Sequence, residues 1–163
     1  MDSDGYFTIK RNLSSQRSGY SVSPLYQERL GIKQVTPQAP ELLKDTFGGG
    51  KVYLEKPSAT NGKMLFVWLA ADLAAAKVAE ALVPFLRIKK RQAELLLLLR
   101  EHKNRLGFGG GRDRVTQHEV KGRWGGTILR ATGIHTPETL AYREALWREI
   151  KSLNDTRYPA AVD

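Results

Sequence analysis

Two segments near the N-terminus alternate between apolar and polar residues, and this alternation restricts the fold more than any other feature of the sequence. In Tyr6–Leu13, Phe7 and Ile9 share one parity and polar residues take the other. Tyr26–Val35 repeats the pattern, with Leu30 on the apolar parity. A period of two is the repeat of a β-strand that buries one face. The sequence therefore predicts two amphipathic strands.

The rest of the chain predicts an α+β fold with four strands and several helices. The other predicted elements are a helix from Thr36 to Gly48, strands over Lys51–Lys56 and Met64–Ala70, helices over Asp72–Leu86 and Lys89–Leu106, and a helix from Thr136 to Asn154. Thr36, Asp72 and Thr136 are predicted N-caps, and Gly48 is a predicted C-cap. Two strand pairs with helices elsewhere favour an antiparallel four-stranded sheet covered by helices on one face.

The predicted elements divide the chain into three parts. Residues 1–106 form the predicted core, and residues 137–163 form a C-terminal helix and tail. Between them, residues 107–136 are basic and glycine-rich, and the sequence pattern assigns no helix or strand to them. We expect this region to be an insertion.

Composition points to a polyanionic partner and to an intracellular location. The 163 residues carry a formal charge of +9, and a surplus of this size on a small domain favours nucleic acid, although a merely solvated basic surface shares it. Cysteine is absent, no apolar run approaches the ~20 residues of a membrane span, and no signal peptide is visible. These features predict a protein that is neither secreted nor embedded in a membrane.

Basic side chains share the outward parity of three predicted strands. They are Lys10, Arg29, Lys33 and Lys51. A cationic sheet face can lie against duplex DNA and read base edges in the major groove. The alternatives are a solvated sheet face, or a basic RNA-binding structural protein with the same charge.

A pair of carboxylates, Asp2 and Asp4, precedes the first strand in the run Asp2-Ser3-Asp4-Gly5. Hard divalent cations prefer carboxylate oxygens, and Mg²⁺ commonly takes one or two of them together with waters and substrate phosphates. An ordinary turn before a strand gives the same pattern. The three histidines (102, 118 and 135) lack ligand spacing and are expected at the surface.

Five segments in the same order resemble the single-motif LAGLIDADG homing endonucleases. They are Asp2-Ser3-Asp4-Gly5 with its strand, Gly31-Ile32-Lys33-Gln34-Val35, Leu42 to Gly49, Pro84 to Ala93, and Trp147 to Asp155. The resemblance implies a ββαββα core and a site-specific, metal-dependent DNA endonuclease, with a non-catalytic DNA-binding or RNA-splicing (maturase-like) module as the alternative. It also implies double-stranded DNA as the partner and a homodimer with one motif per chain.

The resemblance also implies roles for individual residues. Asp4 matches the catalytic acid that coordinates Mg²⁺, Gln34 a residue that orients solvent, and Lys89 a cation near the scissile phosphate. Because relatives bind DNA along the sheet, the expected DNA contacts are Thr8, Lys10, Asn12, Arg29, Lys33, Lys51 and Tyr53.

The sequence begins at Met1, where the motif helix of that family would still be running. We therefore expect this form to be a poor dimer and a poor nuclease. We also expect its apolar strand residues to lose part of their cover. These residues are Phe7, Ile9, Leu30, Ile32, Val52 and Leu54.

Overall fold

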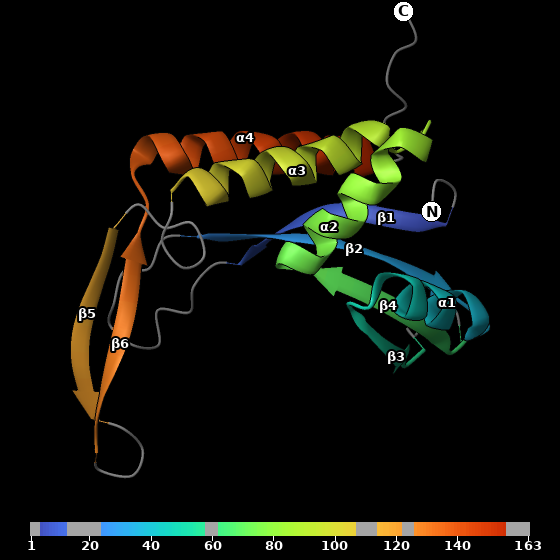
Figure 1. Cartoon of the computed structure of the whole chain (residues 1–163), viewed down its shortest axis with the longest axis horizontal. Helices are drawn as coiled ribbons and strands as arrows, with labels where there is room; N and C mark the ends of the chain where they lie inside the picture. Colours follow the sequence, from blue (N-terminus) through green and yellow to red (C-terminus); the bar gives the residue numbers. More distant parts are fainter. Residues whose placement is uncertain (1–3, 13–23, 58–61, 107–113, 122–125, 156–163) are drawn as a thin grey trace, which may run out of the picture.

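The computed structural model describes residues 4–12, 24–57, 62–106, 114–121 and 126–155 (Figure 1). Its elements follow the order β1 (Gly5–Asn12), β2 (Leu25–Gln34), α1 (Gln38–Phe47), β3 (Lys51–Glu55), β4 (Leu65–Ala71), α2 (Asp72–Leu82), the 3₁₀ turn η2 (Val83–Phe85), α3 (Lys90–Arg105), β5 (Arg114–Lys121), β6 (Thr127–Ile134) and α4 (Pro137–Asn154). The strands and helices predicted within the core are all present, with small differences at their ends.

The first four strands form one antiparallel sheet in the order β1-β2-β4-β3. Gly5 pairs with Ile32 at one end of the β1–β2 ladder, and Asn12 pairs with Leu25 at the other. β2 and β4 are the central strands, and β1 and β3 are the edges. The predicted α+β fold with an antiparallel four-stranded sheet is therefore confirmed.

Helix ends follow local chemistry at some positions and depart from it at others. Gly48 ends α1 in the left-handed conformation, with φ of 60°, as a C-cap glycine should. Thr136 caps α4 by accepting a hydrogen bond from the Thr139 amide at 3.2 Å. The predicted Thr36 cap is wrong, because α1 follows Pro37 without a side-chain cap. α2 gives way to η2 before the predicted Leu86, where Pro84 cannot continue an α-helix.

The helices of the core cover one face of the sheet. α2 and α3 contact β2, α3 and α4 contact β1, and α1 contacts β3 and β4. Figure 1 shows α3 and α4 side by side above β1 and β2. Trp68 of β4 is fully buried on this face, where it stacks on Phe47 and donates to the Gly49 carbonyl at 3.0 Å.

The expectation that the apolar strand residues lose cover is wrong for four of the six. Phe7, Ile9, Leu30 and Ile32 are at most 5% exposed. They belong to the cluster formed with apolar residues of α2, α3 and α4. On the edge strand β3, in contrast, Val52 is half-buried and Leu54 remains 44% exposed. Helices α2, α3 and α4 thus close the core over β1 and β2.

The region that the sequence pattern left without structure contains a β-hairpin. β5 and β6 pair antiparallel from Arg114–Ile134 to Lys121–Thr127 and form a separate two-stranded sheet. Figure 1 shows this hairpin extending away from α3 and α4. Among the described residues, no helix is both long and apolar enough to cross a membrane.

Candidate nucleic-acid interface

The sheet face opposite the helices carries all seven side chains that were expected to contact DNA. Parity assigns them to this face, because Phe7 and Leu30, next to Thr8 and Arg29 in the chain, are buried on the other. Trp68 is buried there too, and it pairs with Val52, which stands between Lys51 and Tyr53. The pairing of the strands aligns these residues: Thr8 lies opposite Arg29. Lys33 and Tyr53 lie on either side of Val67, which pairs with both. Lys10, Lys33, Lys51 and Tyr53 are exposed, and Thr8, Asn12 and Arg29 are half-buried. The predicted residues therefore form one surface, which we call the open face.

The open face also holds polar residues that sequence reasoning did not select. Glu55 accepts from the Lys33 ammonium, with its two oxygens 2.6 and 2.9 Å away, so Lys33 is not a free cation. Gln27 accepts from Arg29 Nε at 2.9 Å. Both residues share the parity of the predicted contacts, and that parity was the available signal. Neither was selected, although Thr8, Asn12 and Tyr53 on the same face were.

Tyr6 is a third addition to the open face. Its ring lies over Gly31, since a Cβ added there would stand 2.9 Å from the Tyr6 hydroxyl. Burial raises the pKa of the Tyr6 phenol above its ordinary value, and Tyr53 adds to the rise. The Arg29 charge opposes it. Tyr6 is therefore a neutral hydrogen-bonding group on the open face, lying over the central strand β2.

The three expected catalytic residues lie at one end of the sheet. Asp4 is exposed and immediately precedes β1. Gly5 pairs with Ile32, two residues before Gln34 at the end of β2. The Lys89 ammonium, just before α3, donates to the carbonyl of Gly5. Gln34 has the parity of Ile32 and so lies toward the helix-covered side, half-buried.

The donors at this end suit a hard cation that takes most of its ligands from elsewhere. The exposed Asp4 makes no hydrogen bond or ion pair with the described residues. The described part of the chain contains no group of three or more His, Cys, Asp or Glu side chains able to enclose a metal. One carboxylate per chain fits Mg²⁺, which commonly completes its shell with waters and phosphate oxygens. Asp2 lies outside the described residues.

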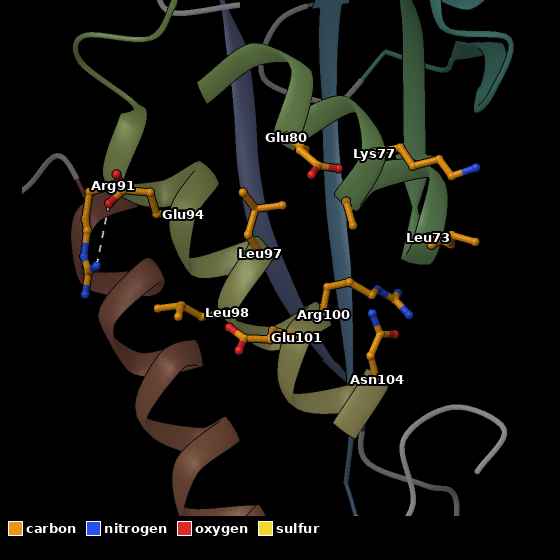
Figure 2. Close-up of a pocket in the computed structure, with 11 residues that line it drawn as sticks. Leu73, Lys77, Glu80, Arg91, Glu94, Leu97, Leu98, Arg100, Glu101 and Asn104 are labelled. Carbon is orange, nitrogen blue, oxygen red and sulfur yellow. Dashed lines mark ion pairs between the residues drawn. The ribbon is translucent and has the colours of Figure 1, made fainter. Parts of the chain in front are cut away.

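A groove of about 630 Å³ between α2 and α3 lies on the helical side of the molecule, away from the open face (Figure 2). Its lining alternates apolar residues such as Leu73 and Leu97 with charged residues such as Lys77 and Glu80. None of the residues that the sequence predicted to be functional lines it.

The expected surface position is wrong for His135, which is only 4% exposed. Its Nε2 lies 3.2 Å from Nη1 of the buried Arg143. Arg143 Nε in turn donates to His102 Nδ1 at 3.4 Å, and the His102 ring stacks on Tyr142. The side chain of His118 lies outside those described. His102 and His135 therefore belong to the packing between α3 and α4.

Sequence comparison finds no protein-family model and no curated protein that matches this chain. The three-dimensional structure is similar to solved homing endonucleases. One is I-CvuI, solved in complex with a DNA target in the presence of Mg, with a TM-score of 0.61 and 15% identity over 98% of this chain and 80% of that one. Another is the archaeal intron-encoded enzyme I-Vdi141I complexed with DNA, with a TM-score of 0.57 and 13% identity over 99% of this chain and 83% of that one.

These similarities extend over nearly the whole chain and include the sheet, the helices on its one face and the C-terminal elements. At 13–15% identity they establish the arrangement of the backbone. The chain therefore has the fold of the LAGLIDADG homing endonucleases.

Proposed function

We propose that this chain is a site-specific DNA endonuclease that binds duplex DNA on the open face and hydrolyses a phosphodiester beside Asp4 with Mg²⁺. The observation that carries the proposal is the bond from Lys89 to the Gly5 carbonyl, because it brings a cation to the residue that follows Asp4. Phosphodiester hydrolysis needs a metal ligand and a positive group close to the same phosphate.

Each of the three residues has a distinct role in this proposal. Asp4 holds Mg²⁺, which supplies charge neutralisation and an acidified water when bound. Lys89 stabilises negative charge on the phosphate as it develops. Gln34, at the same end of the sheet, orients solvent through its amide.

DNA lies along the open face. Lys10 and Lys51 hold phosphates, and the other side chains of the open face, Arg29 among them, meet base edges. A single Asp4 per chain serves one strand, so cutting both strands takes two copies. A homodimer on a pseudo-palindromic site satisfies this requirement.

The binding surface is tested by the affinity for duplex DNA as a function of salt. We expect log K to fall linearly with log salt, with a slope of about −0.9 for each phosphate contact. Arg29→Ala and Lys10→Ala should weaken binding. Lys77 is an exposed lysine of α2 on the helical side. Lys77→Ala removes the same charge from there and should leave DNA binding unchanged. Equal losses in all three variants would reject the open face as the binding surface.

The catalytic role is tested with Asp4→Asn on a duplex site selected from randomised DNA. We expect the variant to lose Mg²⁺-dependent cleavage and to bind the site at least as tightly as the parent, since a negative charge near phosphate is removed. Asp45→Asn on α1 provides the matched control and should cut normally. Cleavage by Asp4→Asn would show that another group holds the metal. Binding without cleavage by the parent would identify a non-catalytic DNA-binding module, and a preference for folded intron RNA would identify a maturase-like one.

A further inference from the structure

Asp72 stands at the junction between the open face and the helix layer. It follows the last residue of β4, Ala71, and begins α2. Its φ of 52° makes it the only non-glycine residue with positive φ among those described. L-residues avoid this conformation, and Asp and Asn are among the few that tolerate it. Because Ala71 is the N-cap and makes no side-chain cap bond, helix capping does not account for the position of the Asp72 side chain.

The carboxylate of Asp72 instead makes two contacts, one with each side of the sheet. Gln27 of the open face donates from Nε2 to Oδ2 at 2.6 Å. On the helical side, the Lys103 ammonium lies 3.8 Å from Oδ1. Lys103 is only 7% exposed and is itself held by the fully buried Glu28 at 2.6 Å. Asp72 thus ties a side chain of the open face to a fixed cation in the interior.

The contact with Asp72 sets the orientation of Gln27 and, through it, of Arg29. Since the Gln27 amide nitrogen points to Asp72, its oxygen points to Arg29 and accepts from Nε at 2.9 Å. The terminal nitrogens of the Arg29 guanidinium make no hydrogen bond with the described residues. A guanidinium that is held through Nε, with its two terminal nitrogens left to donate, is suited to bidentate contact with a guanine edge.

We propose that Asp72 is a positioning residue for base recognition, which orients the Arg29 guanidinium through Gln27 without touching DNA itself. The inference rests on the proposed DNA binding and adds a residue to the determinants of its specificity. Loss of the relay lets the guanidinium turn toward any phosphate, which relaxes the choice of base while preserving attraction to the backbone.

The experiment measures the dissociation constant for the site changed at each base pair in turn, divided by the dissociation constant for the selected duplex site. Asp72→Gly removes the carboxylate and adopts positive φ without strain. We expect it to lower the ratio about tenfold at the base pair that Arg29 reads, in line with the worth of a bidentate contact. Affinity for unrelated duplex should not fall. Asp72→Asn keeps an oxygen for Gln27 and should retain most of the discrimination.

Two controls separate positioning from charge and from folding. Glu80→Gln removes the same charge from another exposed position of α2 and should leave the ratio unchanged. Gln27→Ala breaks the relay without altering the start of α2 and should reproduce the loss. It therefore tests the inference even if Asp72→Gly fails to fold. In an Arg29→Ala background, Asp72→Gly should have no further effect on the ratio.

The possible results separate this inference from the function on which it rests. A parent protein that binds no duplex, or binds all sequences equally, rejects the inference together with sequence-specific DNA binding. A parent that discriminates, with Gln27→Ala discriminating equally well, rejects the role of Asp72 alone. A loss spread evenly over all base pairs, or an equal loss in Asp72→Asn and Asp72→Gly, also rejects it, because charge and not orientation would then be responsible.

Discussion

Replacing Glu28 by glutamine should destabilise the fold more than any other change to a single charge that we consider. The Glu28 side chain is fully buried, and its Oε2 accepts from Lys103 at 2.6 Å and from Arg100 at 3.0 Å. The glutamine has the same volume but leaves the Lys103 ammonium, 7% exposed, with the solvent-exposed Asp72 as its one counter-charge among the described residues. Removing one partner of a buried pair costs about 3–5 kcal/mol.

A loss of this size is large compared with the stability of a typical domain, about 5–15 kcal/mol. For a chain of this length it corresponds to a fall in Tm of about 6–20 °C. The assay is chemical unfolding followed by circular dichroism, with thermal melting in parallel. Glu101→Gln on α3 is the matched control. It breaks the exposed pair with Arg105 at 2.9 Å, which should cost less than about 0.5 kcal/mol.

The same buried pair should be replaceable as a unit. Burial lowers the pKa of Lys103 despite the attraction of Glu28, so the charged form is less favourable here than in water. Replacing both partners of such a pair by apolar residues is commonly neutral or stabilising. We therefore expect Glu28→Met with Lys103→Met to recover part of the loss seen in Glu28→Gln, because Arg100, 18% exposed, still loses its carboxylate partner. A free energy of unfolding for Glu28→Gln within about 0.5 kcal/mol of the parent would refute this account of the interior.

Three further predictions concern the site, the sheet and pH. Lys89→Ala should slow single-turnover cleavage by at least about tenfold with unchanged binding, since one charge-stabilising donor is commonly worth more than this; an unchanged rate would make Lys89 a structural residue. Gly31→Ala should cost several kcal/mol in urea unfolding, because its Cβ would stand 2.3 Å from the Trp68 carbonyl oxygen; near-parental stability would contradict the β2–β4 geometry. Burial and a 2.5 Å hydrogen bond to Glu144 raise the pKa of Tyr26 to about 12, so the folded state keeps a proton that the unfolded chain loses. Stability should therefore fall as the pH rises from 10 to 12, and Tyr26→Phe should flatten that part of the profile.

Local pattern was enough to predict most of the elements. Period-two alternation fixed the two N-terminal strands within one residue at each end, because a strand with one buried face must alternate. Gly48 and Thr136 marked helix ends correctly, since left-handed backbone and amide capping depend on the residues themselves. The hairpin at 114–134 was missed. Its strands form a sheet of their own, and their sequence lacks an apolar–polar alternation.

For the candidate site too, the sequence predicted some features and missed those that depend on contacts between distant residues. Parity alone placed the cationic residues on one sheet face, and the resemblance supplied Asp4, Gln34 and Lys89. The sequence did not reveal that Lys89 reaches the Gly5 carbonyl, because 84 positions separate the two residues. Nor did it show that Glu55 neutralises Lys33, since that contact depends on β4 standing between β2 and β3.

The sequence by itself determined the periodicity of the strands, the helix ends marked by Gly48 and Thr136, and the basic character of one sheet face. These depend on residues within a few positions of one another. Tertiary structure alone decided the order β1-β2-β4-β3 and the closure of the core by α2, α3 and α4. It also decided that Glu28 is buried among cations and that Asp72 binds Gln27. A buried charge is tolerated only beside its partners, and 75 residues separate Glu28 from Lys103. Only the folded chain brings such partners together.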